Sequence, residues 1–238
     1  MSGISRFEQS PTLMNYFTPN FLEFFKELAA NNHKEWFDEN RARYKKEVKD
    51  PFTHFVGDLI GHIHGSYEPE LVVEPKDVIF RINRDIRFAK DKTPYKTNVS
   101  ALISPKGRKA ADYPALYIEL SPEHLGIYGG CYMLKPAQVK AMRQHMANHL
   151  EQFQALNSDS GFRKYYPDGI VGESQKRVDK DVAEAAQQEP ILFQKQFYYS
   201  HAADAELIPT DALLITVLDH YEAAFNMMQF LRDGWAAK

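Results

Sequence analysis

The chain has 238 residues, a formal net charge of -3 and a hydrophobic content of 44%, values typical of a soluble globular protein. No run of roughly 20 apolar residues could span a membrane, so we expect no membrane partner. The N-terminal residues lack the apolar core of a signal peptide, and the single cysteine excludes an internal disulfide. We therefore expect a cytoplasmic protein. The nearly balanced charge gives no general argument for nucleic-acid binding, which would have to depend on a local basic patch.

The first part of the chain shows the spacing of helices. Residues 1–17 are expected to form a lead-in segment, and residues 18–238 a single α+β domain, because neither a repeat nor a clear linker divides them. Thr18 and Pro19 are favourable residues at a helix start, and apolar residues then recur every three or four positions as far as residue 66. Three helices are therefore expected before that point.

After residue 66 the apolar residues alternate with polar ones, which is typical of strands. Four strands are expected, at residues 78–88, 97–104, 115–120 and 125–132. Their short connections favour an antiparallel meander. Further helices should begin at Pro136 and span residues 179–188 and 210–235. The predicted fold class is α+β: an antiparallel sheet of four or more strands with helices packed mainly on one face.

Positive charge is concentrated in residues 78–97, which we call the basic segment. Two carboxylates, Asp85 and Asp91, accompany six cations in this segment. The cations are Arg81, Arg84, Arg87, Lys90, Lys92 and Lys96. Such a density of cations in a chain of net negative charge indicates a place where an anion could be held.

The predicted strand divides this segment into two faces, because alternate side chains of a strand point the same way. Arg81, Asp85 and Arg87 should line one face, and apolar side chains, Phe88 among them, the other. Arg84 falls on the apolar face. It must therefore reach an edge or pair with a carboxylate, because a lone buried guanidinium is costly.

Two interpretations of the basic segment stay open. Its charges form internal ion pairs, such as Arg81 or Arg87 with Asp85, or they bind an anion: a phosphate, a nucleotide or a nucleic-acid backbone. In the second case Tyr95 would add a ring on which a base stacks. Catalysis by Asp85 or Asp91 is a further alternative, although nearby cations lower the pKa of a carboxyl group and make it a poor general acid.

The run R-D-I-R-F-A-K-D-K-T-P-Y-K-T at residues 84–97 resembles the signature of a family of bacterial and fungal proteins, the domain of unknown function 2461 family. Residues 21–41 are similar to the N-terminal helix pair of that family, and residues 117–122 and 126–130 to its central strands. The resemblance covers most of residues 18–235. It implies a single α+β domain and brings no assigned activity.

Two other segments offer weaker signals for anion binding. Glycines at residues 126–130 precede the helix start at Pro136, where free backbone amides can bind an anion, although glycines in a strand more often mark close packing. Lys106, Arg108 and Lys109 form a polar loop that extends the positive region. Most such clusters are only solvated charge.

The remaining chemistry-bearing residues also give weak signals. Cys131 is expected to be a small buried hydrophobic residue rather than a nucleophile. His145 and His149 have a spacing that can bind zinc, but they lack the glutamate of the usual motif, so we expect neither a metal nor a cofactor. Asp219 and His220 are expected to form a surface pair rather than an oriented base.

The sequence favours a protein that binds a phosphate-bearing ligand, a nucleotide or a nucleic acid, on the basic segment. The predicted ligand-binding residues are Arg81, Arg84, Arg87, Lys90, Lys92, Tyr95, Lys96 and Tyr128. The alternative is an enzyme acting on a small anionic substrate, with Asp85, Asp91 or Glu119 as its candidate catalytic residue. A third hypothesis is an interaction protein that exposes the aromatic residues 193–199, whose secondary structure stays open, although a role in the core is preferred.

Overall fold

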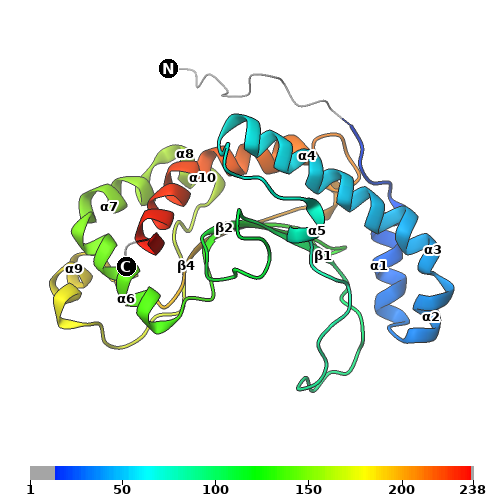
Figure 1. Ribbon diagram of the computed structural model, residues 1–238, viewed down its shortest axis with the longest axis horizontal. Coiled ribbons are helices and arrows are strands. Elements are labelled where there is room, and N and C mark those ends of the chain that lie inside the picture. The colour runs from blue at the N-terminus through cyan, green and yellow to red at the C-terminus, as the bar shows by residue number, and fades with distance from the viewer. Residues whose placement is uncertain (1–13, 237–238) are drawn as a thin grey trace. The chain divides into compact units, whose positions relative to one another are not determined.

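The computed structural model describes residues 14–236 (Figure 1), so most of the predicted lead-in, residues 1–13, lies outside the described residues. The end of that lead-in is part of a core. The ring of Phe17 is 1% exposed and packs against the rings of Phe21 and Phe55.

The chain divides into two compact units. Among the described residues, unit 1 consists of residues 14–108, 118–126 and 202–218, and unit 2 of residues 109–117, 127–201 and 219–236. Each unit combines helices with segments of strands. The single domain expected over residues 18–238 stays a prediction.

The helices of unit 1 are α1 (Asn20–Ala30), α2 (Lys34–Glu39), α3 (Arg41–Tyr44), the π-helical turn η1 (Lys45–Lys49), α4 (Asp50–Ser66), α5 (Pro75–Val78), the short 3-10 turn η4 (Ala205–Leu207) and residues 213–218 of α10 (Leu213–Ala236). The helices before residue 66 occupy the region where the sequence predicts three helices, whereas α5 and η4 are not among the predicted helices. α4 carries Pro51 in its first turn, where no intrahelical partner is needed for the missing N–H group. The second predicted helix is interrupted at Asn40, which separates α2 from α3.

Four strands form one antiparallel sheet in the order β1-β2-β3-β4, which confirms the predicted α+β class. The strands are β1 (Val99–Ile103), β2 (Ala115–Leu120), β3 (Leu125–Cys131) and β4 (Phe197–Ala203). The first three confirm the strands predicted between residues 97 and 132. The fourth arises from the aromatic stretch that the sequence alone does not assign. Within unit 1, α4 and α5 contact β1.

The prediction of a strand at residues 78–88 is wrong. α5 occupies its first residue, and among residues 14–236 the continuation pairs through two isolated antiparallel bridges only: Ile79 with Ala101 and Asn83 with Tyr95. Pro94, in the opposite arm, has no N–H group to offer a continuous ladder. The predicted alternation survives without the strand, because Arg81 is exposed whereas Ile82 is buried.

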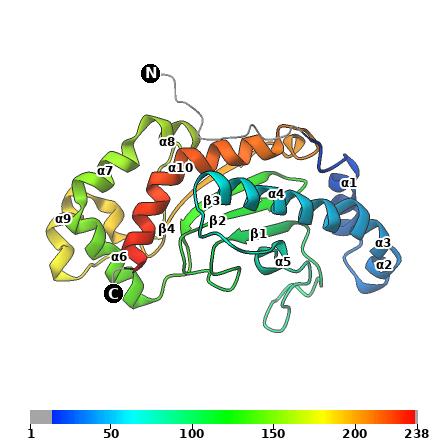
Figure 2. The same ribbon diagram turned by 45° about the horizontal axis from the view of Figure 1, so that its top comes forward.

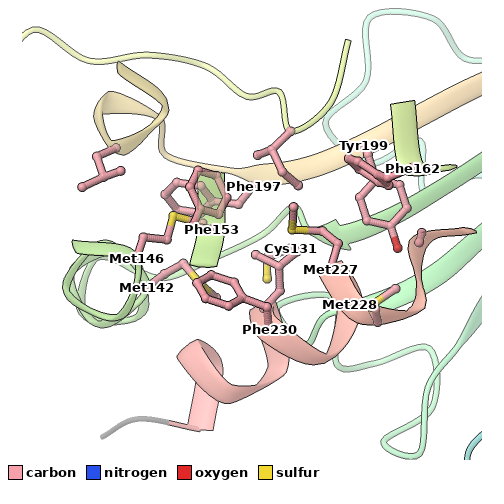
Figure 3. Packing of buried hydrophobic residues seen from close by; sticks show 14 of the residues in the cluster. Cys131, Met142, Met146, Phe153, Phe162, Phe197, Tyr199, Met227, Met228 and Phe230 are labelled. Atoms are coloured by element: carbon pink, nitrogen blue, oxygen red, sulfur yellow. The ribbon is translucent and has the colours of Figure 1, made fainter. Parts of the chain in front are cut away.

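Unit 2 is built around an apolar cluster (Figure 3). Its helices are α6 (Pro136–Asn148), α7 (Leu150–Ser158), α8 (Ser160–Tyr165), η2 (Lys180–Val182), α9 (Ala183–Gln188) and η3 (Pro190–Phe193), together with residues 219–236 of α10 (Leu213–Ala236). Cys131, Phe197 and Phe230 are fully or almost fully buried in this cluster. Phe197 therefore confirms the core role preferred for the aromatic stretch 193–199. No helix within residues 14–236 is long and apolar enough to cross a bilayer.

Candidate anion-binding segment

The basic segment forms two arms that extend from α5 and β1 as a long loop (Figures 1 and 2). Backbone hydrogen bonds join the arms in antiparallel fashion. The amide of Lys96 donates to the carbonyl of Ile82 at 2.8 Å, and the amide of Arg84 donates to the carbonyl of Pro94 at 2.9 Å. Residues 85–93 connect the arms beyond these bonds, and we call them the closing loop.

One arm is clamped to the turn between α1 and α2. The side-chain amide of Asn32 donates to the carbonyl of Tyr95 at 2.9 Å and accepts from its backbone amide at 3.1 Å. The ring of Tyr95 is 6% exposed and stacks on the ring of Phe37, with 4.1 Å between centroids. The ring that the sequence suggests for ligand stacking is therefore already stacked inside the protein.

Arg84 pairs with a carboxylate, as its position in the apolar pattern requires. Its Nη1 lies 2.5 Å from Oδ2 of Asp91 and also bonds to the side chain and the carbonyl of Thr93. The backbone amide of Thr93 and then the Arg84 guanidinium lower the pKa of Asp91 to about 2. This network fixes the end of the closing loop.

Arg87 is also paired internally. Its Nε and Nη2 donate to the two carboxylate oxygens of Asp85 at 2.9 and 2.7 Å. The pair lowers the pKa of Asp85 to about 2, chiefly through the Arg87 side chain. Both partners are exposed, so the pair contributes little to stability and leaves Arg87 reachable. Ionised carboxylates of this kind are poor general acids.

Three other cations of the segment, Arg81, Lys90 and Lys92, form no ion pair with a carboxylate within residues 14–236, although the charge of Arg81 helps to lower the pKa of Asp85. Within residues 14–236, the exposed side chains of Arg81 and Lys90 make neither a hydrogen bond nor an ion pair. Lys92 donates to the carbonyl of Ile86 at 2.9 Å, which satisfies one donor but not its charge. Six cations and two carboxylates give the segment a formal charge of +4.

Lys96 lies deeper than the other cations. Its Nζ is 5.1 Å from the centroid of the Phe80 ring, and burial lowers its pKa, opposed by the charge of Glu119 and assisted by that of Arg81. Glu119, on β2, has its Oε1 at 3.7 Å from Nε2 of His124 in the following turn. Glu119 and Lys96 thus belong to one mixed-charge cluster at the base of the arms.

The exposure of Phe88 was not predicted from the sequence. Its side chain is 95% exposed, the highest value among the large hydrophobic side chains within residues 14–236. The prediction that it lies on an apolar strand face is wrong, because the strand does not continue into the closing loop. The guanidinium carbon of Arg87 lies 6.0 Å from the centroid of its ring. The residues after Phe88, Ala89 to Asp91, are poor strand formers. They indicate in the sequence that the strand does not continue past Phe88.

The other basic loop is partly used in packing. The guanidinium of Arg108 bonds to the carbonyl of Lys76, and its backbone amide donates to the carbonyl of Asp77 at 3.0 Å. Lys106 and Lys109 are exposed, but they belong to different units. Tyr128, the remaining predicted ligand-binding residue, lies in unit 2 with its ring 5.6 Å from that of Tyr117.

The glycines and the cysteine of β3 serve packing in unit 2. A Cβ at Gly129 would lie 2.3 Å from ring atoms of Tyr199, and one at Gly130, where φ is +104°, would lie 2.4 Å from the carbonyl oxygen of Phe197. Cys131 is fully buried, and burial raises the pKa of its thiol. These observations agree with close packing at the glycines and confirm a buried cysteine.

His220 is not the surface residue that the sequence predicts. It is 4% exposed, and its ring lies 4.5 Å from that of His201. Burial and then the neighbouring His201 lower its pKa to about 4. The rings of His145 and His149 are 4.8 Å apart on α6. Within residues 14–236 no three His, Cys, Asp or Glu side chains gather in a group that could hold a metal ion.

Comparison with known proteins gives a family but no activity. A family model described as a conserved hypothetical protein (DUF2461) matches residues 20–230 of the chain. The matched range includes the whole basic segment. A search of curated proteins finds no match to the chain.

Proposed function

The chain belongs to the DUF2461 family of conserved hypothetical proteins, and because that membership brings no activity with it, we propose from the residues of the chain itself that the basic segment binds a phosphate-bearing ligand. The observation that carries this proposal is the state of Arg81 and Lys90. Both are exposed cations that make neither a hydrogen bond nor an ion pair within residues 14–236. The charge of Arg81 helps to lower the pKa of Asp85, but the Asp85 carboxylate already bonds to Arg87. Phosphate oxygens supply the charge-assisted acceptors that such side chains lack.

The internal ion pairs support binding rather than replace it. Arg84 with Asp91 and the Asn32 clamp on Tyr95 fix the backbone that carries the unpaired cations. A ligand then meets cations on a backbone that is already fixed, so less backbone conformational entropy is lost on binding. A purely structural network accounts for the ion pairs of Arg84 and Arg87. Within residues 14–236 it includes no ion pair of Arg81 or Lys90, and Arg81 contributes to it only a longer-range attraction to Asp85.

Titration of the purified protein with pyrophosphate and with a short single-stranded oligonucleotide tests this proposal. We expect affinity at about 50 mM salt that falls steeply by about 200 mM, because bound cations release counterions. Arg81→Ala and Lys90→Ala should each lower affinity about tenfold at low salt, since a charge-assisted hydrogen bond contributes about 1.5–3 kcal/mol. Circular dichroism checks that the variants remain folded.

Lys140→Ala is the matched control, because Lys140 is an exposed cation of α6 outside the basic segment. It removes the same charge and should leave affinity within about twofold. If no phosphate-bearing probe binds at low salt, or if Lys140→Ala weakens binding as much as Arg81→Ala, the proposal fails.

An enzyme acting on a small anionic substrate is the second candidate, and one observation favours it. Glu119 lies beside His124 and interacts with the partly buried Lys96, so a carboxylate, an imidazole and an amine form one cluster, and the charge of Arg81 acts on Lys96. Carboxylates, imidazoles and amines are the groups that most often act as general acids and bases. Turnover of a small phosphate ester that Glu119→Gln abolishes while affinity stays unchanged would support this candidate, and turnover that persists in the variant would remove it.

A further inference from the structure

The exposed ring of Phe88 has a setting unlike that of an ordinary surface residue. A single exposed apolar side chain needs no explanation by itself. Phe88, however, lies in the closing loop, directly after Arg87 and shortly before Lys90 and Lys92. A ring that is 95% exposed is thus surrounded in sequence by cations.

The ring is open on the protein side as well. Its one aromatic or cationic neighbour within residues 14–236 is the Arg87 guanidinium, at 6.0 Å from the ring centroid, and that guanidinium is itself held by Asp85. In contrast, Tyr95 at the base of the same segment has its ring covered by Phe37. In the basic segment, Tyr95 is therefore used for anchoring and the Phe80 ring is next to Lys96, whereas the Phe88 ring is open to a ligand.

We propose that Phe88 is a stacking platform for a base of a single-stranded nucleic acid, whose phosphates are bound by Arg81 and Lys90. This inference depends on the proposed function and names its ligand class. Proteins that bind single strands combine cations that follow the backbone with aromatic rings on which bases stack. The basic segment presents both features along one ribbon, with cations on its arms and in the closing loop.

The structure favours a single strand over a duplex. In a duplex both faces of each base are covered by neighbouring bases, so an aromatic side chain must first separate them. A single strand offers its base faces directly. A mononucleotide is also a poorer match, because the unpaired cations are distributed between an arm, at Arg81, and the closing loop, at Lys90, instead of converging on one phosphate group.

A membrane surface is a poorer match than a nucleic acid. Binding in the plane of a bilayer uses a continuous apolar face of several side chains. Within residues 85–93, all of which the structure describes, Phe88 is the only exposed large hydrophobic side chain. One ring is enough to stack with one base, but it makes a small apolar face for a membrane.

Fluorescence anisotropy with a labelled oligonucleotide of about 12 nucleotides and with an abasic strand of the same length tests the inference. Phe88→Ala should weaken binding of the normal oligonucleotide about tenfold and leave binding of the abasic strand unchanged, since stacking contributes about 1–3 kcal/mol per base. Phe88→Trp should retain or improve binding, and its indole fluorescence should fall when the oligonucleotide is added.

The controls separate the two proposals. Arg81→Ala should weaken binding of both strands, because both carry phosphates. If Arg81→Ala does so while Phe88→Ala binds the normal strand as the unmodified protein does, the stacking inference is overturned and the anion-binding function stands. If neither strand binds at low salt, both are overturned. If phosphatidylserine vesicles bind and Phe88→Ala reduces only that binding, the ring serves a membrane surface, and the stacking inference is again overturned.

Discussion

The basic segment of unit 1 and the apolar cluster of unit 2 both contain side chains that could bind a ligand or do chemistry, but they differ in how far these side chains are exposed. In unit 2 the thiol of Cys131 and the imidazole of His220 are buried among apolar and aromatic neighbours. In the basic segment Arg81, Lys90 and Phe88 are exposed. The comparison teaches that a residue type indicates chemistry only once its partners in the structure are known.

The largest expected effect tests the close packing of unit 2. Gly129→Val should lower the free energy of unfolding by about 3 kcal/mol or more, because even its Cβ would overlap the Tyr199 ring and the surrounding core cannot move far. Urea denaturation measures the change. Gly61→Ala in α4 is the control, since a Cβ there meets nothing within 4 Å and should stabilise the helix by about 0.5–1 kcal/mol. Equal stability of Gly129→Val and the unmodified protein would contradict this account.

The next effect depends on pH. The pKa of His220 in the folded protein is about 4, against about 6.5 in an unfolded chain. Between these values the unfolded state binds a proton that the folded state does not, so stability should fall as the pH falls from about 6.5 to 4, by up to about 3 kcal/mol. Denaturation curves at several pH values measure the loss. His220→Gln should remove this part of the pH dependence, and parallel curves for the two proteins would show that His220 is not its source.

A smaller effect separates anchoring from binding within the basic segment. Asn32→Ala removes both hydrogen bonds to the Tyr95 backbone and should cost about 1–2 kcal/mol of stability. Arg81→Ala should change stability by less than about 0.5 kcal/mol, because its exposed side chain makes no hydrogen bond or ion pair within residues 14–236 and solvent screens its attraction to Asp85. The comparison requires thermal or urea unfolding together with ligand affinity. A loss of stability in Arg81→Ala as large as that in Asn32→Ala would assign Arg81 to the structural network.

Much of the fold follows from local patterns in the sequence. The period of two between residues 97 and 132 corresponds to β1, β2 and β3, because each strand buries one face and joins its neighbour through a short connection. The fourth strand, β4, could not be assigned in this way. Its residues 197–203 pair with β3 across a long separation in sequence, and an aromatic run fits a buried helix as well as a strand.

The candidate site was predictable in composition but not in geometry. The cation density at residues 81–96 is visible in the sequence, and so is the need of Arg84 for a carboxylate. Alternation alone could not show that the strand pattern stops before Phe88, because an apolar residue after Arg87 continues the period whether or not a ladder exists. Tyr95 is buried because its ring stacks on Phe37, which is distant in sequence, whereas Phe88 has no such partner ring within residues 14–236. The sequence alone could not show which of the two rings is exposed.

The Asn32 clamp on Tyr95 consists of an uncharged amide and two backbone groups, supported by stacked rings. Added electrolyte, which weakens attraction between ions, acts little on such dipolar and apolar contacts. The clamp should therefore keep its shape across a wide range of ionic strength, whereas salt screens the Arg84–Asp91 ion pair that fixes the end of the closing loop. Loss of ligand on raising the salt concentration then reports ionic contacts, those with the ligand and the one that holds the closing loop, and not the release of Tyr95 from Asn32.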